Sequence, residues 1–372
     1  ILALLGVPVR VWPRAPLIKN MNELFQLMVC PKNKSEFIYE KDQNILISSN
    51  ENYKYDLYNG IPILFFQQSN LDKNIKAWWG DLYKQLYSEI DDTLNKENIF
   101  VHLKKFENLM CKMDHLLFNE MLNTNFKNKI CLEIGPGSGA HSTLLKSYGA
   151  KMISMDITLE RCVSTDKKLK LIDGDHLVFN ASAEKIPLKD NCVDFIYSNG
   201  VLHHAENTEN CFTEIHRVLK KNGKSIISLY CRSSAEYYFN ILPKAFIFGS
   251  YFRHKNEANW IGEITEGKPK FSQIKNPVTR VYNKKEILKL FKNFEIISIR
   301  KHCFSFKDFC IPRLTQFREW FLNKIGYKYY DSKIVYGKDI IPFTNTEKLL
   351  GKFFGFFWYI VSEKKNESKK II

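Results

Sequence analysis

The fold is decided by the stretch CLEIGPGSG at residues 131–139, which continues into AHSTLLKSY at residues 140–148. Three glycines, Gly135, Gly137 and Gly139, let the backbone turn sharply and approach a ligand closely. A helix that begins at Ala140 presents free N–H groups and a partial positive charge to such a ligand. The stretch therefore predicts a strand, a ligand-binding loop and a helix, in that order.

Working outward, apolar runs and amphipathic runs continue to alternate. We expect strands at residues 129–134, 151–156, 177–180, 193–198, 224–230, 294–300 and 357–362, and helices at residues 140–148, 208–219 and 284–291. Asn222-Gly223 predicts a turn before the fifth strand. This order predicts an α/β fold with a mostly parallel, doubly wound, Rossmann-like sheet.

Asp156 ends the second expected strand, where an acid accepts the two ribose hydroxyls of a nucleotide cofactor. The loop and the acid alone leave two enzyme classes open, because Gly135 to Ala140 also satisfies the dinucleotide pattern G-x-G-x-x-A. A nicotinamide dehydrogenase therefore stays an alternative at this point, as does a glycine loop without any ligand.

Three further blocks separate these classes, namely AEKIPL at 183–188, VDFIYSNGVLHH at 193–204 and EIHRVLK at 214–220. With the glycine loop they stand in the order and spacing of one family. Over about residues 128–231 the chain resembles the class I S-adenosylmethionine (SAM)-dependent methyltransferases of the type-11 group. The resemblance implies a methyltransferase with SAM as its cofactor.

The resemblance also implies roles for single residues. The methionine end of SAM is expected at Glu133, Gly135, Gly137 and Gly139, the ribose at Asp156, the adenine at Ser182 and Ala183, and the sulfonium beside Asn199 and Val201. Family members often carry Asp where Ser182 stands, and a serine hydroxyl still forms a hydrogen bond.

Methyl transfer from SAM requires the acceptor, the methyl carbon and the sulfur to be held in line, and it requires neither a covalent nucleophile nor a metal. A base is needed only when the acceptor must lose a proton. His203 and His204 are the catalytic candidates, although the pair also belongs to the family's fold signature and is often structural. We expect His216 at the surface. The Asn/Asp-Pro-Pro-aromatic motif of exocyclic-amine methyltransferases is missing after the fourth strand.

Residues 21–68 resemble the small zinc-ribbon-like domain that is fused to, or partnered with, methyltransferases. The resemblance rests on LMVCP at 27–31 and YDLYNGIPIL at 55–64. It places Cys30, Asn33, Ser48 and Glu51 at the four zinc-ligand positions. Because one thiolate cannot form a tetrahedral sulfur site, we predict a module without zinc and a protein without a metal site.

The remaining segments complete the predicted domain organisation. Residues 69–128 form a helical segment with Trp78, Leu82, Leu86 and Ile90 spaced four apart, which indicates either a core-packing helix or a cap that closes over the cofactor. The catalytic domain spans 129–362, with irregular substrate-binding insertions at 232–278 and 301–354. Residues 1–20 are expected to be a dispensable leader and residues 363–372 a polar tail.

The formal net charge of +15 indicates either a solvated basic surface or an anionic partner such as RNA or a membrane surface. We favour the solvated surface, because lysines predominate and no arginine-rich block occurs. Nine scattered cysteines without a CxxC pair indicate a reducing, cytoplasmic location. The apolar stretch Leu349 to Val361 contains Lys352 and is shorter than the roughly 20 residues of a bilayer span, so no transmembrane segment is predicted.

The function predicted from the sequence is methyl transfer from SAM to a small-molecule acceptor, at oxygen, carbon or nitrogen. An aromatic set in the first insertion favours an apolar or ring-containing acceptor: Tyr237, Tyr238, Phe239, Phe246, Phe248, Tyr251, Phe252 and Trp260. The alternatives are an RNA methyltransferase and a non-catalytic SAM-binding partner protein. A nicotinamide dehydrogenase comes last, because no catalytic Tyr and Lys or His and Asp pairing is found.

Overall fold

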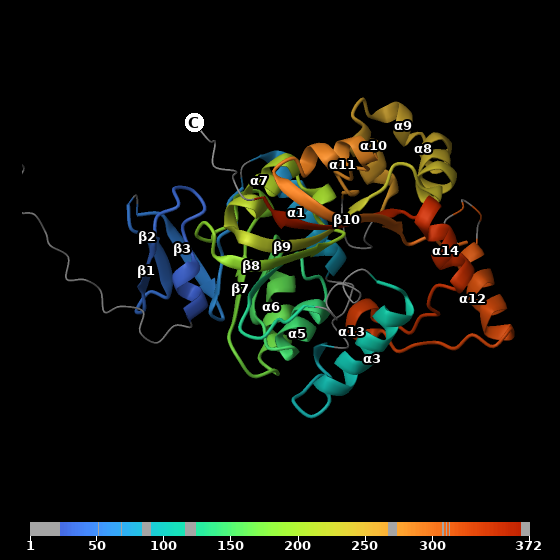
Figure 1. Ribbon diagram of the computed structural model, residues 1–372. Helices are drawn as coiled ribbons and strands as arrows, with labels where there is room; N and C mark the ends of the chain where they lie inside the picture. The colour runs from blue at the N-terminus through green and yellow to red at the C-terminus, as the bar shows by residue number, and fades with distance from the viewer. Residues whose placement is uncertain are drawn as a thin grey trace, which may run out of the picture.

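The computed structural model describes residues 23–50, 52–67, 69–83, 91–115, 124–266, 274–306, 309, 311 and 313–365 of the 372-residue chain. A central sheet carries helices on both faces (Figure 1). A small β module lies at one end of the molecule, and the helices of the two insertions lie at the other. The predicted leader at 1–20 lies outside the described residues.

The main sheet consists, within the described residues, of seven strands in the order β10-β11-β9-β8-β5-β6-β7. The strands from β9 to β7 run parallel; at one edge β11 pairs antiparallel with β9, and β10 pairs antiparallel with β11. This arrangement confirms the predicted mostly parallel α/β fold. The bounds are β5 Ile130–Ile134, β6 Lys151–Asp156, β7 His176–Asn180, β8 Val193–Asn199, β9 Leu219–Tyr230, β10 Phe294–His302 and β11 Phe357–Lys364.

Alternate side chains of the central strands enter two separate apolar cores, since successive residues of a strand point to opposite faces. Leu132 and Ile134 of β5 enter one core with side chains of α7 (Thr208–Val218) and α11 (Lys284–Leu290). Cys131 of the same strand enters the other core. Helices α3 (Ile99–Lys112), α5 (Ala140–Ser147) and α6 (Leu159–Leu169) complete that second core.

The turn predicted at Asn222-Gly223 is wrong, because these residues form a bulge inside β9. Val193 pairs with Leu219, whereas Phe195 pairs with Lys224, so β9 carries extra residues between the two pairings. Asn222 takes a left-handed conformation with φ 59°. A bulge absorbs extra residues without ending the strand, which is why β9 begins before the predicted turn. The neighbouring strand β11 runs to Lys364, past the domain boundary predicted at 362.

The two insertions are helical in the described residues, so the prediction of irregular structure was wrong there. Two of these short helices start from side-chain caps: Asn256 caps one, and Thr344 forms a capping box with Glu347 at the other. No helix in the described part of the chain is both long and apolar enough to cross a membrane. The helices are α8 Leu242–Ile247, α9 Ser250–Arg253, α10 Glu257–Ile264, α12 Leu314–Lys324, α13 Lys333–Tyr336 and α14 Asn345–Phe354.

The N-terminal module is an antiparallel sheet of β1 (Phe37–Glu40), β2 (Ile45–Ser48), β3 (Lys54–Tyr58) and β4 (Ile61–Pro62). A turn at Asn59-Gly60, with φ of 51° and 82°, joins β3 to β4. Three backbone hydrogen bonds tie the module to the main domain, from Leu64 N to Asn180 O at 2.8 Å, from Val29 N to Pro187 O at 3.1 Å and from Lys189 N to Leu27 O at 2.8 Å. Side chains of the module also enter the same apolar core as β5 and α7.

The residues at the predicted zinc-ligand positions have contacts of other kinds. The Cys30 thiol is buried, 3.3 Å from the Tyr55 hydroxyl. Asn33 Oδ1 accepts hydrogen bonds from Ser35, and Ser48 Oγ accepts one from Tyr53 N. Glu51 lies outside the described residues. Among the residues described here, no group of three or more His, Cys, Asp or Glu side chains is placed to hold a metal ion.

Replacing Cys30 tests the prediction of a module without zinc. We expect Cys30→Ser to lower the free energy of unfolding by about 1 kcal/mol, the usual cost of one small substitution, because a serine hydroxyl still reaches Tyr55. Elemental analysis of the wild-type chain is expected to find far less than one zinc per molecule. A stoichiometric zinc that the substitution removes, together with loss of the folded module, would contradict the prediction.

Candidate functional site

The glycine loop after β5 folds tightly against its neighbours. Gly135 (φ 71°) donates its N–H to Met155 O at 2.8 Å, and a Cβ added there would meet Val201 Cγ2 at 2.4 Å. A Cβ at Gly139 (φ 78°) would meet Thr165 Oγ1 at 2.9 Å. At Gly137 (φ 55°) an added Cβ would meet nothing within 4 Å. Packing therefore requires glycine at 135 and 139, whereas Gly137 leaves open space above the loop.

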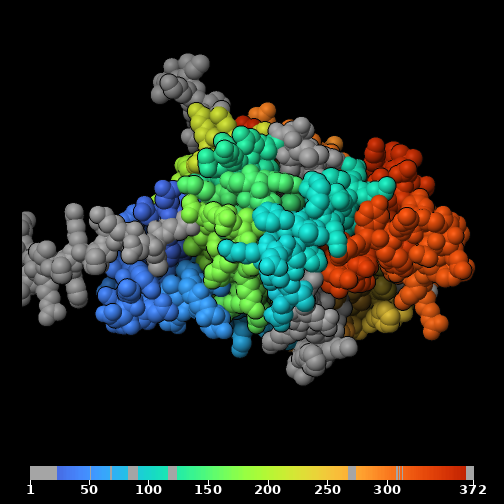
Figure 2. Space-filling model, turned by 90° about the horizontal axis from the view of Figure 1, so that it is seen from below, coloured from blue at the N-terminus to red at the C-terminus, as the bar shows by residue number. Residues whose placement is uncertain are grey.

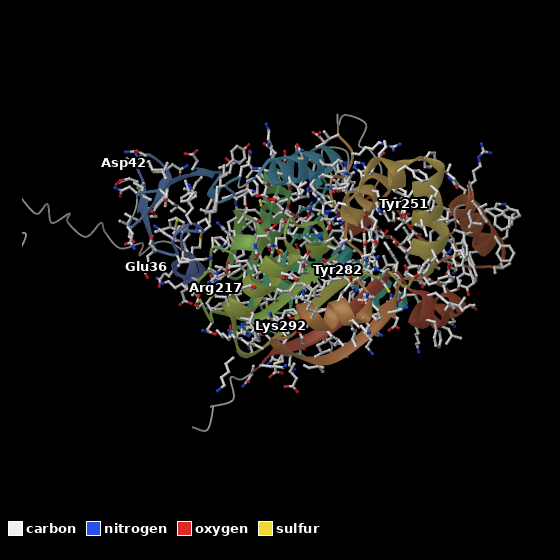
Figure 3. All side chains as sticks on the ribbon, turned by 90° about the horizontal axis from the view of Figure 1, so that it is seen from above. Glu36, Asp42, Arg217, Tyr251, Tyr282 and Lys292 are labelled. Carbon is white, nitrogen blue, oxygen red and sulfur yellow. The ribbon has the colours of Figure 1, made fainter. Side chains whose placement is uncertain are left out.

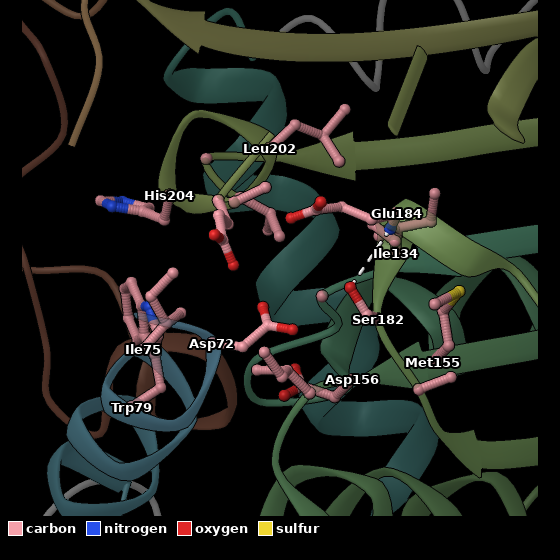
Figure 4. Close-up of a pocket in the computed structure, with 18 residues that line it drawn as sticks. Asp72, Ile75, Trp79, Ile134, Met155, Asp156, Ser182, Glu184, Leu202 and His204 are labelled. Atoms are coloured by element: carbon pink, nitrogen blue, oxygen red, sulfur yellow. Dashed lines mark hydrogen bonds between the residues drawn. The ribbon is translucent and has the colours of Figure 1, made fainter. Parts of the chain in front are cut away.

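A pocket opens at the carboxyl ends of β5, β6, β7 and β8, where ligands bind in parallel α/β sheets (Figure 4). The space between its walls, including the open mouth, is about 680 Å³. Five of the predicted cofactor residues line it: Gly135, Asp156, Ser182, Ala183 and Val201.

Asp156 occupies the predicted position at the end of β6. It is 6% exposed, and burial raises the pKa of its carboxyl group to about 6. Its Oδ1 atom accepts hydrogen bonds from the backbone N–H and the hydroxyl of Thr158, both at 2.8 Å. The loop at Thr158 thus folds back over the carboxylate and buries it. Asp156 therefore holds the start of α6 as well as facing the pocket.

Three further acids line the pocket, Asp72, Glu184 and Glu206, and of these only Glu184 stands in a motif block of the sequence. Asp72 comes from α1 (Asn70–Tyr83) and points toward the side of the pocket where Asp156 and Ser182 lie (Figure 4). Burial raises the pKa of Glu184, and the charges of Asp72 and Glu206 raise it further. Four acids around one pocket favour a ligand with positive charge.

The other predicted cofactor residues do not line this pocket. Glu133 is 2% exposed and accepts a hydrogen bond from Ser142, and burial raises its pKa to about 7. Asn199 accepts a hydrogen bond from the Ser228 hydroxyl at 2.6 Å. Gly137 and Gly139 belong to the loop beside the pocket. The structure thus brings these four residues next to the pocket wall rather than into it.

The two histidines differ in position. His204 lines the pocket, and its Nδ1 lies 3.1 Å from Val278 O, so Nδ1 carries the proton. Its Nε2 then bears a lone pair and has no partner among the described residues. Burial lowers the pKa of His204, which keeps the ring neutral. His203 does not line the pocket and packs on Tyr230 with ring centroids 3.7 Å apart, as a core side chain does.

Helix α1 forms the opposite wall of the pocket with Asp72, Ile75 and Trp79, which share one helical face. The Trp79 ring meets His204 edge to face, with centroids 4.9 Å apart. Trp78, which the apolar spacing singled out, is fully buried on another side of the helix. The helix thus both packs on the core and covers the pocket. Leu86 and Ile90 lie outside the described residues.

The aromatic set of the first insertion does not enclose the pocket, contrary to our expectation. Tyr237 and Trp260 are buried in a separate apolar cluster. The other six are exposed, and none of the eight lines the pocket. His216 is half-buried and packs edge to face on Phe294, so the expected surface position was only partly correct.

Residues 132–227 match the family described as "Methyltransferase domain". An uncharacterized Methanocaldococcus jannaschii protein, MJ1123, is 38% identical over 103 residues, which are 28% of this chain and 45% of that protein. The sterol 4-C-methyltransferase strm-1 of Caenorhabditis elegans is 29% identical over 103 residues, 27% of this chain and 31% of that protein. The chain therefore spans less than half the length of these two relatives.

The N-terminal module has similar proteins of its own. A UPF0434 protein of Ehrlichia ruminantium (strain Gardel) is 36% identical over 47 residues, 13% of this chain and 86% of that protein. Among solved structures, a SAM-dependent methyltransferase of Methanosarcina mazei covers 67% of this chain and 98% of its own, with 16% identity and a TM-score of 0.44. Residues 132–227, in the centre of the main α/β domain, therefore correspond to a methyltransferase domain.

Proposed function

We propose that the whole protein transfers a methyl group from SAM to a small-molecule acceptor, at oxygen, carbon or nitrogen. The observation that carries the proposal is Asp156, a buried acid at the end of β6 that faces a pocket lined by three more acids. SAM is a cation with two ribose hydroxyl donors, and both features suit such a pocket. SAM supplies an activated methyl group, so the protein's task is to bind and align.

The residue roles expected from the sequence stay as part of this proposal. Asp156 accepts the ribose hydroxyls, and Ser182 and Ala183 border the adenine. Gly135, Gly137 and Gly139 with Glu133 serve the methionine end, and Asn199 and Val201 lie beside the sulfonium. The lining of the pocket by five of these nine residues supports the assignment.

The acceptor side of the pocket has a different character. Ile75 and Trp79 of α1 face Leu202 and His204 across it, and this wall suits a small organic acceptor rather than a nucleic acid. The name of one relative, a sterol 4-C-methyltransferase, points the same way. We propose that α1 caps the cofactor within a helical segment at 69–128, between the module at 21–68 and the catalytic domain from residue 129.

A labelling experiment tests the acceptor class. The full chain is incubated with methyl-labelled SAM and an extract of source cells, which is then separated into organic-soluble, aqueous small-molecule, RNA and protein fractions. We expect label in a small-molecule fraction. Label that ribonuclease releases would instead identify an RNA methyltransferase. Tight SAM binding without any labelled product would identify a non-catalytic SAM-binding protein.

The buried carboxyl group of Asp156 predicts a pH dependence of SAM binding. In the free protein its pKa is about 6, so the group is protonated below that pH, whereas a bound cation favours the ionised form. SAM affinity should therefore fall as the pH is lowered through 6, by up to about tenfold per unit. Calorimetry at several pH values, in buffers of different ionisation enthalpy, measures the affinity and the protons released on binding.

The variant Asp156→Asn separates a ligand role from a structural one. Its side-chain oxygen still accepts from Thr158, but the charge is gone, so SAM affinity should fall at least about tenfold at neutral pH. Because the pKa of Asp156 is raised in the folded protein, the wild-type protein loses folding stability as the pH rises through 6. The SAM-free variant has no such carboxyl group and should therefore be at least as stable as wild type at pH 7.5. If the Asp156→Asn variant bound SAM normally, or if it unfolded, the assignment of Asp156 to the cofactor site would be wrong.

Replacing His204 tests it as a proton acceptor. If Nε2 accepts the acceptor's proton, His204→Gln should lower kcat by about 10²-fold or more while SAM affinity stays nearly constant. The matched control is His216→Gln, a histidine of α7 outside the pocket, which should leave both quantities unchanged. Measuring kcat with the labelled acceptor fraction and SAM affinity by calorimetry decides the matter. An unchanged kcat would leave His204 as a packing residue beside Trp79.

A further inference from the structure

Two helices of the second insertion expose their apolar side and bury their charged side. On α14, Glu347 is completely buried, whereas Leu349 and Phe353 are 57% and 63% exposed. On α12, Phe317 and Trp320 form an exposed stripe, whereas Arg318 faces inward with Leu322. A helix on the surface of a water-soluble protein shows the opposite pattern. The inversion indicates that this face meets a less polar medium than water.

A buried ion pair fixes this orientation. Arg318 and Glu347 form two parallel hydrogen bonds of 2.6 Å, with the Arg318 guanidinium 9% exposed and the Glu347 carboxylate fully buried. Glu347 also accepts a hydrogen bond from Ser305 at 2.8 Å, and Arg318 donates one to Pro342 O at 3.1 Å. Rotating either helix to bury its apolar stripe would leave a charge without its partner, which costs far more than an exposed phenylalanine.

The first insertion also exposes aromatic side chains. Phe246, Phe248 and Phe252 of the α8–α9 region are exposed, Phe252 to 74%. Phe239 of the first insertion stacks on Phe309 of the second, with centroids 5.4 Å apart, so the two insertions are in contact. Both lie at the end of the molecule away from the N-terminal module (Figures 1 and 3). We define the insertion face by Phe246, Phe248, Phe252, Phe317, Trp320 and Phe353.

Basic residues border the insertion face. Residues 242–256 contain no Asp or Glu, and they include Lys255, which is exposed, and Arg253, whose guanidinium pairs with Glu263. Lys324 and Lys352 are exposed beside the aromatic stripes of α12 and α14. The space-filling view from below shows the second insertion, in orange and red, at the end of the molecule opposite the blue N-terminal module (Figure 2). Exposed aromatic rings with a lysine and arginine border are the composition of helices that lie in a membrane interface.

We propose that the insertion face docks on the surface of an anionic lipid bilayer. The rings enter the boundary between headgroups and acyl chains, and the basic border meets the anionic headgroups. A second copy of the chain fits less well, because two basic borders would repel each other. A nucleic acid would satisfy the basic residues but would leave the phenylalanines of α8 and α9 in water. The bilayer satisfies both features of the face.

Vesicle flotation with the full chain tests the proposal. We expect binding to vesicles of phosphatidylcholine with about 30% phosphatidylglycerol, weaker binding to phosphatidylcholine alone, and loss of the difference at high salt. The double variant Phe252→Ser, Phe353→Ser should bind the anionic vesicles at least about tenfold more weakly. Both side chains are exposed, so the variant should keep the wild-type thermal midpoint and SAM affinity.

The matched control removes two exposed apolar side chains at the other end of the molecule. Ile38→Ser, Tyr58→Ser changes the N-terminal module, where these residues are 42% and 49% exposed, and should bind vesicles as wild type does. Equal binding by both double variants, or no binding of wild type to anionic vesicles, would overturn the proposal. So would a wild-type dimer in solution that Phe252→Ser, Phe353→Ser converts to a monomer, because that result assigns the face to a second copy. None of these outcomes depends on methyl transfer.

Discussion

The contact between Gly135 and Val201 is the constraint on which the site depends. With φ 71° and no side chain, Gly135 lets the loop after β5 lie directly on the loop after β8, where any Cβ would come within 2.4 Å of Val201. Its N–H also binds the end of β6 through Met155 O. One residue thus holds the ends of three neighbouring strands together. The pocket forms because the ends of β5, β6 and β8 lie close together and the loop between them carries no side chain at Gly135.

The sequence pattern predicted the strands of the central sheet well, and it predicted the pocket-facing side of α1 and the insertion helices poorly. The strand Lys151–Asp156 agrees residue by residue, because a strand buried on both faces reads as one apolar run. Asp72 and Trp79 were missed, since the apolar spacing of α1 marks only the side that packs on the core. The insertion helices were missed because their buried face carries Arg318 and Glu347, so the usual amphipathic pattern is reversed. The bulge at Asn222 could not be predicted from the sequence, because it depends on how β9 pairs with β8.

In the N-terminal module, buried side chains hold the strands together, a role that a cross-link has in other small modules. Cys30 and Tyr55 are buried against each other, and Phe37 packs edge to face on the same Tyr55 ring, with centroids 5.6 Å apart. Small β modules rarely bury enough apolar surface to fold alone. This module shares the apolar core of β5 and α7, and the larger domain supplies the surface that it lacks.

That shared core has a consequence for cooperativity. Leu24 and Leu46 of the module belong to one continuous apolar cluster with Phe179 of β7 and Leu188, and Leu64 continues the backbone hydrogen bonding to Asn180. Opening the module would expose Phe179 and Leu188 to water at the same time. The module and the α/β domain are therefore expected to melt as one unit in a single transition, and the chain carries its module as an integral part of one folding unit rather than as an exchangeable subunit.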